Sequence, residues 1–243
     1  MSTVLVTGGA RRLGAAISRE LAGAGCEVVI HYGNSCDEAE TLAAEIGGRT
    51  VQGDLADTAD VPALFARACD GGPVDWLVNS ASAFEYDVPG AIDPALAARL
   101  YAINCTAPAL LAASLAAQGR EGAVVNLLDQ KLANPNPDFF SYTLSKTALE
   151  GATVLMAQAF APRVRVNAVA PGLTLPSGDQ SDAEFAAVAA RNLLQHPVEA
   201  HRVAEAVVYL LQAEAVTGQT LFVDCGQRFL KADGDVMFEG RDG

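Results

Sequence analysis

Lysine is scarce in this chain, and its scarcity bears on both charge and function. Among 243 residues there are only three lysines, Lys131, Lys146 and Lys231. Arginine supplies the rest of the basic side chains, and 16 basic against 29 acidic residues give a net charge of -13. An acidic chain repels nucleic-acid and lipid phosphates, so we expect no nucleic-acid partner and no membrane partner. A lysine kept where arginine usually serves indicates a need for a compact, tunable charge.

Cysteine and histidine are also few, and neither type is spaced as a ligand set. The five cysteines, an odd number without a C-x-x-C pair, are Cys26, Cys36, Cys69, Cys105 and Cys225. This usage predicts reduced thiols in a cytoplasm. The three histidines are His31, His196 and His201. They lack metal-ligand spacing, so we expect no metal site.

Long apolar runs and a leader sequence are absent from the pattern. The longest apolar stretches, such as Val164 to Ala170, are far shorter than the roughly 20 residues that cross a bilayer. No basic-then-apolar leader precedes the first apolar run at Val4. We therefore expect a cytoplasmic chain with neither a membrane span nor a signal peptide.

What the chain does have is an alternation of short apolar runs with longer amphipathic stretches. Hydrophobic residues make up 51% and charged residues 19%, which excludes disorder and allows a large core. The spacing predicts strands near residues 4–6, 28–30, 50–52, 76–78, 124–128, 164–170 and 221–223. It predicts helices near 12–24, 36–46, 64–65, 94–118, 140–160, 183–194 and 199–212, the second of which begins with a capping box of Ser35 and Glu38.

Short apolar strands separated by helices are typical of a parallel sheet covered on both faces. We therefore predict an α/β fold: one Rossmann-type, doubly wound domain over residues 1–243, with a seven-stranded parallel sheet. In such a fold ligands lie at the carboxyl ends of the strands.

The first predicted strand ends in a glycine-rich turn that includes Gly8, Arg11, Arg12, Leu13 and Gly14. Glycines let the backbone approach a pyrophosphate, which then rests on the amino end of the following helix. An isolated glycine pair is equally consistent with a plain strand-to-helix turn. The position at the first strand-helix junction and the two adjacent arginines favour a bound nucleotide.

The end of the second predicted strand helps to choose between NAD and NADP. NAD-binding chains usually place an acidic residue there, on the ribose hydroxyls. This chain instead has His31, Tyr32, Gly33, Asn34 and Ser35. Asp37 is better explained by the helix dipole. Arg11 beside Asn34 and Ser35 would suit a 2′-phosphate, so we expect NADP(H).

Motifs in a fixed order over the whole chain resemble the short-chain dehydrogenase/reductase family. They are the glycine turn, Asp54-Leu55, Asn79-Ser80-Ala81, Asn104, Tyr142-x-x-x-Lys146 and the segment from Asn167 to Pro171-Gly172. The resemblance implies that Asp54 and Leu55 touch adenine and that Pro171 and Gly172 meet the nicotinamide. It also implies the strand order 3-2-1-4-5-6-7 and a homotetramer or homodimer.

Four departures from that family's pattern are informative. Asp129 stands thirteen residues before Tyr142, where the family has a serine; Arg12 replaces the middle glycine of the turn; and Ser80 replaces an asparagine. The fourth departure is that the segment beginning at Asn79 continues with Ser82 and Phe84. This combination resembles the pteridine reductase branch, including the dihydromonapterin reductase type.

The spacing of Tyr142 and Lys146 has a physical reason. Residues four apart share one face of a helix, and a nearby ammonium lowers the pKa of a tyrosine. A surface pair is the alternative for such a spacing taken alone. Under the resemblance, Tyr142 donates the proton, Lys146 also holds the nicotinamide ribose, and Asn104 positions a water that relays protons to Lys146.

Asp129 is a poor clamp for a carbonyl because an ionised carboxylate donates no hydrogen bond. We expect it to relay a proton to Tyr142 or to hold an NH-rich ring; a polar loop residue is the plain alternative. Phe84, otherwise a core residue, would stack on a flat substrate, with Ser82 beside it. Arg12 would bridge the pyrophosphate and the pterin, and residues 173–195 would form a lid.

The sequence thus predicts an NADPH-dependent reductase that converts dihydropterins to tetrahydropterins. One alternative is a carbonyl or 3-oxoacyl reductase of the same fold, against which Asp129 argues. The other is a cofactor-binding regulator without turnover, since this fold also hosts sensors. The presence of Tyr142, Lys146 and Asn104 argues against that alternative.

Overall fold

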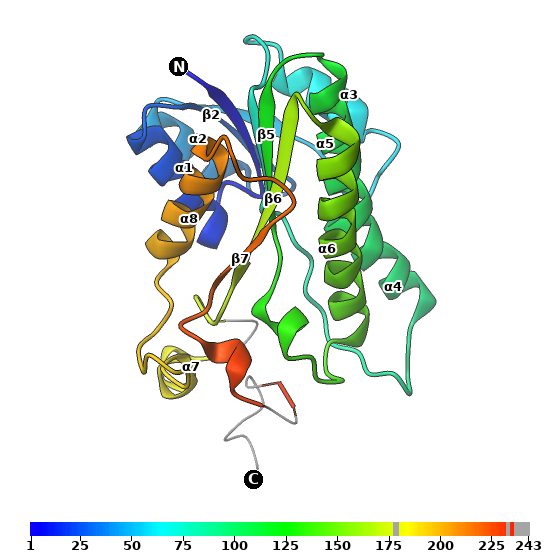
Figure 1. Ribbon diagram of the computed structural model, residues 1–243, viewed down its shortest axis with the longest axis vertical. Helices are drawn as coiled ribbons and strands as arrows, with labels where there is room; N and C mark the ends of the chain where they lie inside the picture. The colour runs from blue at the N-terminus through cyan, green and yellow to red at the C-terminus, as the bar shows by residue number, and fades with distance from the viewer. Residues whose placement is uncertain (177–179, 232–233, 236–243) are drawn as a thin grey trace.

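The computed structural model describes residues 1–176, 180–231 and 234–235, apart from the side chain of Asp182. Its strands are β1 (Thr3–Thr7), β2 (Glu27–Tyr32), β3 (Arg49–Gln52), β4 (Trp76–Asn79), β5 (Gly122–Leu127), β6 (Val164–Pro171) and β7 (Thr220–Val223). They form one parallel sheet in the order β3-β2-β1-β4-β5-β6-β7 (Figure 1). The predicted fold class and strand order are confirmed. The order reverses between β1 and β4, where such sheets bind ligands.

Helices cover both faces of the sheet, as predicted. They are α1 (Arg12–Gly23), α2 (Cys36–Ile46), α3 (Val61–Ala68), α4 (Pro94–Tyr101), α5 (Ala107–Ala117), α6 (Phe140–Phe160), α7 (Asp182–Ala189) and α8 (Ala200–Gln212). A π-helical turn, η1 (Ala102–Thr106), and two 3-10 turns, η2 (Gln130–Ala133) and η3 (Gln227–Phe229), complete the set within the described residues. Figure 1 shows α1, α2 and α8 on one side of the sheet and α3, α5 and α6 on the other.

The alternation of side chains along β1 explains these two layers. Val4 and Val6 are fully buried in the core that also contains Ile17 of α1 and Val207 of α8. Leu5, between them, belongs to the opposite core with α3 and α5. Successive strand residues point to opposite faces, and burying such a side chain stabilises the fold by roughly 1.5–3 kcal/mol. The sheet is therefore held from both sides, which leaves its carboxyl edge for a site.

Two local predictions are wrong. The capping box does not form: Ser35 precedes α2 but makes no side-chain cap hydrogen bond, and Glu38 is paired with Arg11 across 3.6 Å. In addition, α7 ends at Ala189 and not at residue 194. The long helix predicted over 94–118 is confirmed as a continuous helical stretch, Pro94–Ala117, with the π-helical turn η1 in its middle.

The expectation that every apolar stretch is too short to cross a membrane is also wrong. The helical stretch Pro94–Ala117 has 24 residues and is long and apolar enough to cross a membrane, judged by length and composition alone. In the fold this stretch packs as a core helix: Leu100, Leu111 and Leu115 are at most 2% exposed. Its apolar character is therefore explained by contacts with α3 and α6.

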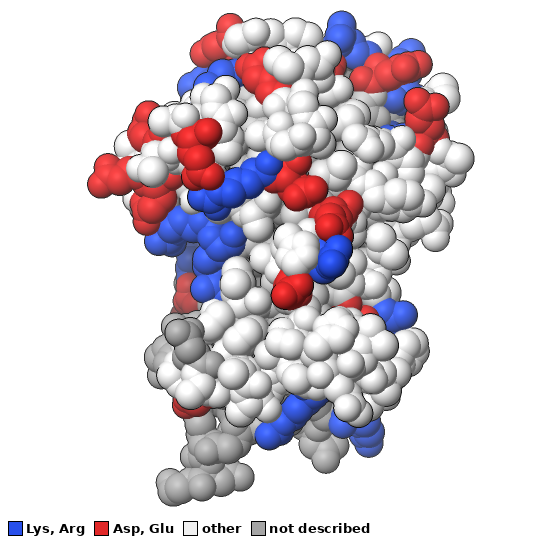
Figure 2. All heavy atoms as spheres, turned by 90° about the vertical axis from the view of Figure 1, so that its left-hand side faces the viewer, with Lys and Arg blue, Asp and Glu red and all other residues white. Residues whose placement is uncertain are grey.

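Charged side chains are mixed in sign over the face seen in Figure 2. Acidic and basic groups alternate over its upper part, and much of the lower part is uncharged. The net charge of -13 is thus not gathered into a single acidic field on this face. Local positive charge is available for an anionic ligand even on an acidic protein.

Candidate active site

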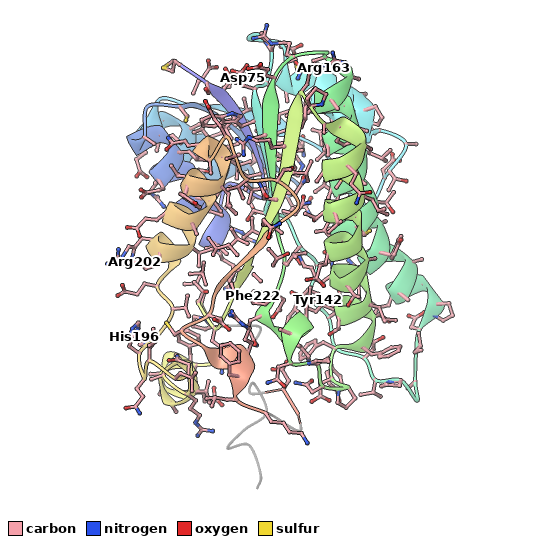
Figure 3. The ribbon with its side chains drawn as sticks, in the orientation of Figure 1. Asp75, Tyr142, Arg163, His196, Arg202 and Phe222 are labelled. Carbon is pink, nitrogen blue, oxygen red and sulfur yellow. The ribbon has the colours of Figure 1, made fainter. Side chains whose placement is uncertain are left out.

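A cleft of about 670 Å³ opens at the carboxyl ends of the strands, within the range of small-molecule sites. Figure 3 shows Tyr142 toward this end of the molecule and Asp75, which precedes β4, at the opposite end. The cleft is lined by these residues predicted from sequence: Gly8, Arg11, Arg12, Leu13, Gly14, Tyr32, Ser35, Ser80, Ala81, Ser82, Phe84, Asp129, Tyr142, Lys146, Pro171 and Gly172.

Two glycines in the turn after β1 occupy places where no side chain fits. Gly8 has φ +61°, and a Cβ there would lie 2.9 Å from Cα of Ala81. A Cβ on Gly14 would lie 2.1 Å from the carbonyl oxygen of Gly8. Glycine at both positions lets the turn fold closely, so that the amino end of α1 faces the cleft.

Thr7 joins this turn to the segment after β4. Its Oγ1 accepts hydrogen bonds from the backbone N–H groups of Ser80 and Ala81, both at 3.1 Å. Two walls of the cleft, from β1 and β4, are therefore held at a fixed separation.

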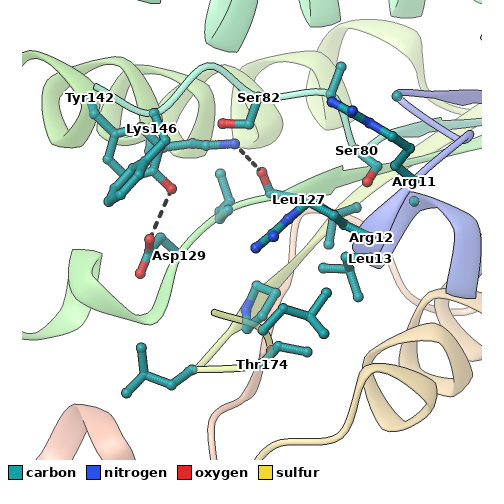
Figure 4. Close-up of a pocket in the computed structure, with 18 of the residues that line it drawn as sticks. Arg11, Arg12, Leu13, Ser80, Ser82, Leu127, Asp129, Tyr142, Lys146 and Thr174 are labelled. Carbon is teal, nitrogen blue, oxygen red and sulfur yellow. Dashed lines mark hydrogen bonds between the residues drawn. The ribbon is translucent and has the colours of Figure 1, made fainter. Parts of the chain in front are cut away.

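Arg11 and Arg12 supply positive charge beside this turn (Figure 4). Arg11 is 61% exposed and pairs with Glu38. Arg12 has φ +53°, a left-handed backbone that favours glycine, and its guanidinium donates to the carbonyl oxygen of Pro176. A strained backbone retained for a charged side chain points to a use for that charge.

Tyr142 and Asp129 form the polar centre of the cleft. The hydroxyl of Tyr142 donates to Oδ2 of Asp129 across 2.9 Å (Figure 4). Oδ1 of Asp129 accepts the backbone N–H of Lys131 at 2.8 Å, which fixes the carboxylate at the start of η2. A carboxylate can accept at both oxygens, so the two contacts are compatible.

Lys146 lies one helical turn after Tyr142 on α6. Its Nζ donates to the carbonyl oxygen of Leu127 across 2.8 Å and lies 5.9 Å from the centre of the Tyr142 ring. Lys146 is only 2% exposed. The predicted pair thus faces the cleft, and the surface-pair alternative is wrong.

Burial controls the pKa values of these three groups. It lowers the pKa of Lys146 to about 8, although the charge of Asp129 opposes the shift. It raises the pKa of Asp129, against the hydrogen bonds from Lys131 and Tyr142. Burial, followed by the charge of Asp129, raises the pKa of Tyr142 well above its usual value. The expected lowering of the Tyr142 pKa by Lys146 is therefore wrong for this structure.

Asn104 lies in the π-helical turn and does not contact Lys146. Its Oδ1 accepts from Ser82 Oγ and from the backbone N–H of Ala83, and its Nδ2 donates to Ala83 O and Ser145 Oγ. These four bonds use the hydrogen-bonding capacity of the amide. The side chain holds the segment 82–83 against α6, and the relay of protons through a water at Asn104 stays a prediction.

Phe84 forms an aromatic wall of the cleft and is 38% exposed, which does not fit the core-residue alternative. Its ring stacks on Phe139 with centroids 4.0 Å apart and meets the edge of Tyr142 at 4.7 Å. Phe139 is only 2% exposed and backs this wall. A flat ligand would find an aromatic face next to the hydroxyl of Tyr142.

Five residues predicted to touch the cofactor do not line the cleft: His31, Asn34, Asp54, Leu55 and Asn79. His31 lies behind the glycine turn, where Nδ1 accepts from Gly8 N–H at 3.2 Å and Nε2 contacts Gly53 O at 3.1 Å. Asn79 is buried and donates to Asn126 Oδ1 at 2.8 Å. Polar side chains at strand ends can serve the scaffold as well as a ligand.

Several cleft residues were missed by sequence reasoning. They are Ala10, Gly33, Leu127, Leu128, Gln130, Lys131 and Asp235, whereas Leu173, Thr174, Leu175 and Gln180 fall within the predicted lid, residues 173–195. Lys131 could have been found, because it is one of only three lysines. Asp235 carries no local signal, since it reaches the cleft from the C-terminal segment.

Comparisons with known proteins agree with this geometry. A family model described as enoyl-(acyl carrier protein) reductase matches residues 8–228. The chain is 31% identical to pteridine reductase 1 of Leishmania tarentolae over 94% of this chain and 96% of that one. The chain belongs to the short-chain dehydrogenase/reductase family. Dihydromonapterin reductase of Enterobacter sp. (strain 638) is 28% identical over 92% of this chain and 95% of its own.

A solved structure of this family is closer in sequence. The alternative dihydrofolate reductase 1 FolM from Brucella suis, in complex with NADP, is 42% identical, with a TM-score of 0.91 over 95% of this chain and 96% of its own. These relatives confirm the assignment to the pteridine reductase-like branch of the family. They also confirm the expectation of an NADP(H)-dependent oxidoreductase.

Proposed function

We propose that this protein reduces dihydropterins to tetrahydropterins with NADPH. The observation that carries the proposal is the hydrogen bond from Tyr142 to Asp129 beside the aromatic wall of Phe84. A proton donor next to a flat face suits the reduction of a C=N bond in a planar ring. The relatives named pteridine reductase and dihydromonapterin reductase support the same substrate class.

The glycine turn fits a dinucleotide cofactor. Gly8 and Gly14 let the chain fold closely onto Ala81 and onto itself, so that the turn and the amino end of α1 form a cradle along the cleft. Arg11 and Arg12 stand beside this cradle, and Arg11 is the candidate for the 2′-phosphate because no acid ends β2. When bound, NADPH supplies the hydride. Lys146, which is buried in the cleft, would hold the ribose hydroxyls of the nicotinamide.

Proton delivery follows from the contact between Tyr142 and Asp129. With Asp129 ionised, the Tyr142 proton points to the carboxylate. With Asp129 protonated, its own proton bonds to the phenol oxygen, and the Tyr142 hydroxyl is free to donate to substrate. Because burial raises the pKa of Asp129, the acid is a proton reserve for the tyrosine.

The cleft also supports the remaining predicted contacts. Ser82 is fixed by Asn104, and Phe84 presents its ring beside it. Arg12 lies between the glycine turn and the loop at Pro176, so it can reach both a pyrophosphate and a pterin. Residues 173–195 are proposed as the lid. Residues 177–179 of that lid lie outside the described residues.

The test is NADPH oxidation with dihydromonapterin, dihydrobiopterin, dihydrofolate and a simple ketone side by side. The proposal expects turnover of at least one dihydropterin and little of the ketone. Turnover of the ketone alone would make the protein a carbonyl reductase. Binding of NADPH without any turnover would make it a cofactor-binding regulator.

We also propose a homotetramer, or a homodimer, in the cytoplasm. Support comes from apolar side chains on the outer faces of α4 and α6: Leu155 is 66%, Leu144 52% and Tyr101 49% exposed. Tyr209 on α8 is 57% exposed and could serve a second interface. Light scattering on purified protein distinguishes these states.

A further inference from the structure

Beyond Asp129 the cleft is lined by Gln130, Lys131 and Asp235. Gln130 and Lys131 belong to η2, which follows β5, whereas Asp235 comes from the C-terminal segment, 104 residues after Lys131. Figure 1 shows η3 beside the turn η2, which follows β5. These residues have no place in the proton transfer described above.

Lys131 is a buried cation with fixed partners. It is only 5% exposed, and its Nζ donates to the carbonyl oxygen of Asp138 at 2.7 Å and to Oδ2 of Asp235 at 3.1 Å. The same ammonium lies 5.5 Å from the centre of the Phe139 ring, which backs Phe84. Lysine is almost never buried unless it is paired, so this contact holds Asp235 beside Lys131 in the lining of the cleft.

Asp235 is held by its backbone as well as by its side chain. Its N–H donates to Oδ2 of Asp138 across 2.8 Å. Its negative charge is close enough to raise the pKa of both Asp129 and Tyr142. Asp235 therefore lies within electrostatic reach of the reacting centre while it lines the cleft.

Gln130 adds a second acceptor at this end of the cleft. Its Oε1 is buried and has no hydrogen-bond partner among the residues that the structure describes. A buried acceptor without a donor costs free energy, which a ligand N–H or O–H would recover. A carboxylate has about four acceptor positions, so Asp235 can accept from a ligand while it is paired with Lys131.

We propose that Asp235, anchored by Lys131, is a specificity-determining residue that binds the substituent of the substrate. Together with Gln130 it accepts hydrogen bonds from hydroxyl or amino groups on that substituent and disfavours an anionic one. The inference rests on the proposed function, because the ring must lie beside Phe84 and Tyr142 for its substituent to reach past Asp129. It goes further by assigning the chemistry of the distal part of the substrate.

The experiment compares three dihydropterins that share one ring: a 6-methyl compound, hydroxylated dihydromonapterin, and dihydrofolate with its terminal carboxylates. Each is measured with the wild type, Asp235→Ala, Asp235→Asn and Asp235→Glu. Asp60→Asn is the control, because Asp60 is also an aspartate paired with a basic side chain (Arg67, 2.9 Å) but does not line the cleft.

In the wild type, kcat/KM for the hydroxylated compound should exceed that for the methyl compound roughly tenfold. In Asp235→Ala this ratio of kcat/KM values should fall close to one, and in Asp235→Glu it should lie between the Asp235→Ala and wild-type ratios. Asp235→Asn should raise the relative use of dihydrofolate. The KM for NADPH should stay within about twofold throughout.

A ratio in Asp235→Ala within about twofold of the wild-type ratio would overturn the inference and leave the proposed function intact. A wild type that reduces none of the three compounds would overturn the proposed function itself. The methyl compound separates the two failures, because its turnover needs no contact with Asp235. A ratio that changes equally in Asp60→Asn would also overturn the inference.

Discussion

The hydroxyl of Tyr142 donates a 2.9 Å hydrogen bond to Asp129, thirteen residues earlier in the chain. The bond joins α6 to the end of β5 and places two titratable groups in one buried contact. Burial raises the pKa of both groups, so each keeps its proton more readily than it would in water. The raised pKa of Asp129 moves toward neutral pH, where a protonated acid can resupply Tyr142 with a proton.

Removal of either partner should slow the reaction, while NADPH still binds at pH 6, below the transition expected for Lys146. Tyr142→Phe should lower kcat by about 10²–10⁴, the usual contribution of a positioned proton donor. Asp129→Asn should lower kcat by roughly 10–100-fold, because Tyr142 then lacks its proton reserve. Steady-state kinetics and NADPH titration check both effects. A Tyr142→Phe variant with about half of wild-type kcat would contradict the assigned role.

The residue type at position 129 should also govern the choice of substrate. Asp129→Ser introduces a hydroxyl, which can donate a hydrogen bond to a carbonyl, where an ionised carboxylate cannot. We expect the ratio of ketone to dihydropterin turnover to rise. An Asp129→Ser variant whose pterin turnover is unaltered would show that Asp129 takes no part.

NADPH binding should weaken as the pH rises through about 8. Burial lowers the pKa of Lys146 to about 8, so above that pH the side chain loses the charge that would favour an anionic cofactor. Because the charge of Asp129 raises the Lys146 pKa, Asp129→Asn should move this transition to lower pH. Fluorescence titrations from pH 6 to about 10 measure it. Lys146→Gln should lack the transition, and its persistence there would assign it to another group.

Arg12→Gly should separate backbone strain from function. Arg12 has φ +53°, which costs an L-residue about 1 kcal/mol, whereas glycine adopts it freely. We expect a free energy of unfolding within about 1 kcal/mol of wild type and NADPH affinity reduced about tenfold. Arg12→Ala retains the strain and should be less stable than Arg12→Gly in chemical denaturation. Undiminished NADPH affinity in both variants would remove Arg12 from the cofactor site.

His31 should make the fold sensitive to mild acid. Burial lowers the pKa of His31 to about 4, below the usual 6.5, so between these values the unfolded chain binds more protons than the folded one. Stability should therefore fall by up to about 3 kcal/mol as the pH falls through this window and level off below it. His31→Gln should reduce this slope. Equal slopes for the two proteins, measured by urea unfolding at several pH values, would show that His31 titrates normally.

The fold and the centre of the site were predictable because their signals are local. Strands of four to eight residues ended by glycine or polar groups are visible in the sequence, and Tyr142 and Lys146 share a face because they are four apart. The inward turn of His31 and Asn79 was not predictable, because a polar residue at a strand end has the same pattern whether it serves the scaffold or a ligand. The absence of the capping box was not predictable either, because Glu38 pairs with Arg11, which precedes a different helix, α1.

The contact between Lys131 and Asp235 has a consequence for the order in which the cleft is completed during synthesis of the chain. One wall of the cleft begins at Gly8 and another ends at Asp235, so nearly all of the described chain must leave the ribosome before the site is whole. The glycine turn is synthesised early, but the proposed cofactor residues Lys146 and Pro171 follow much later, and Asp235 later still. The proposed site for the substituent of the substrate is thus the last part of the cleft to be synthesised.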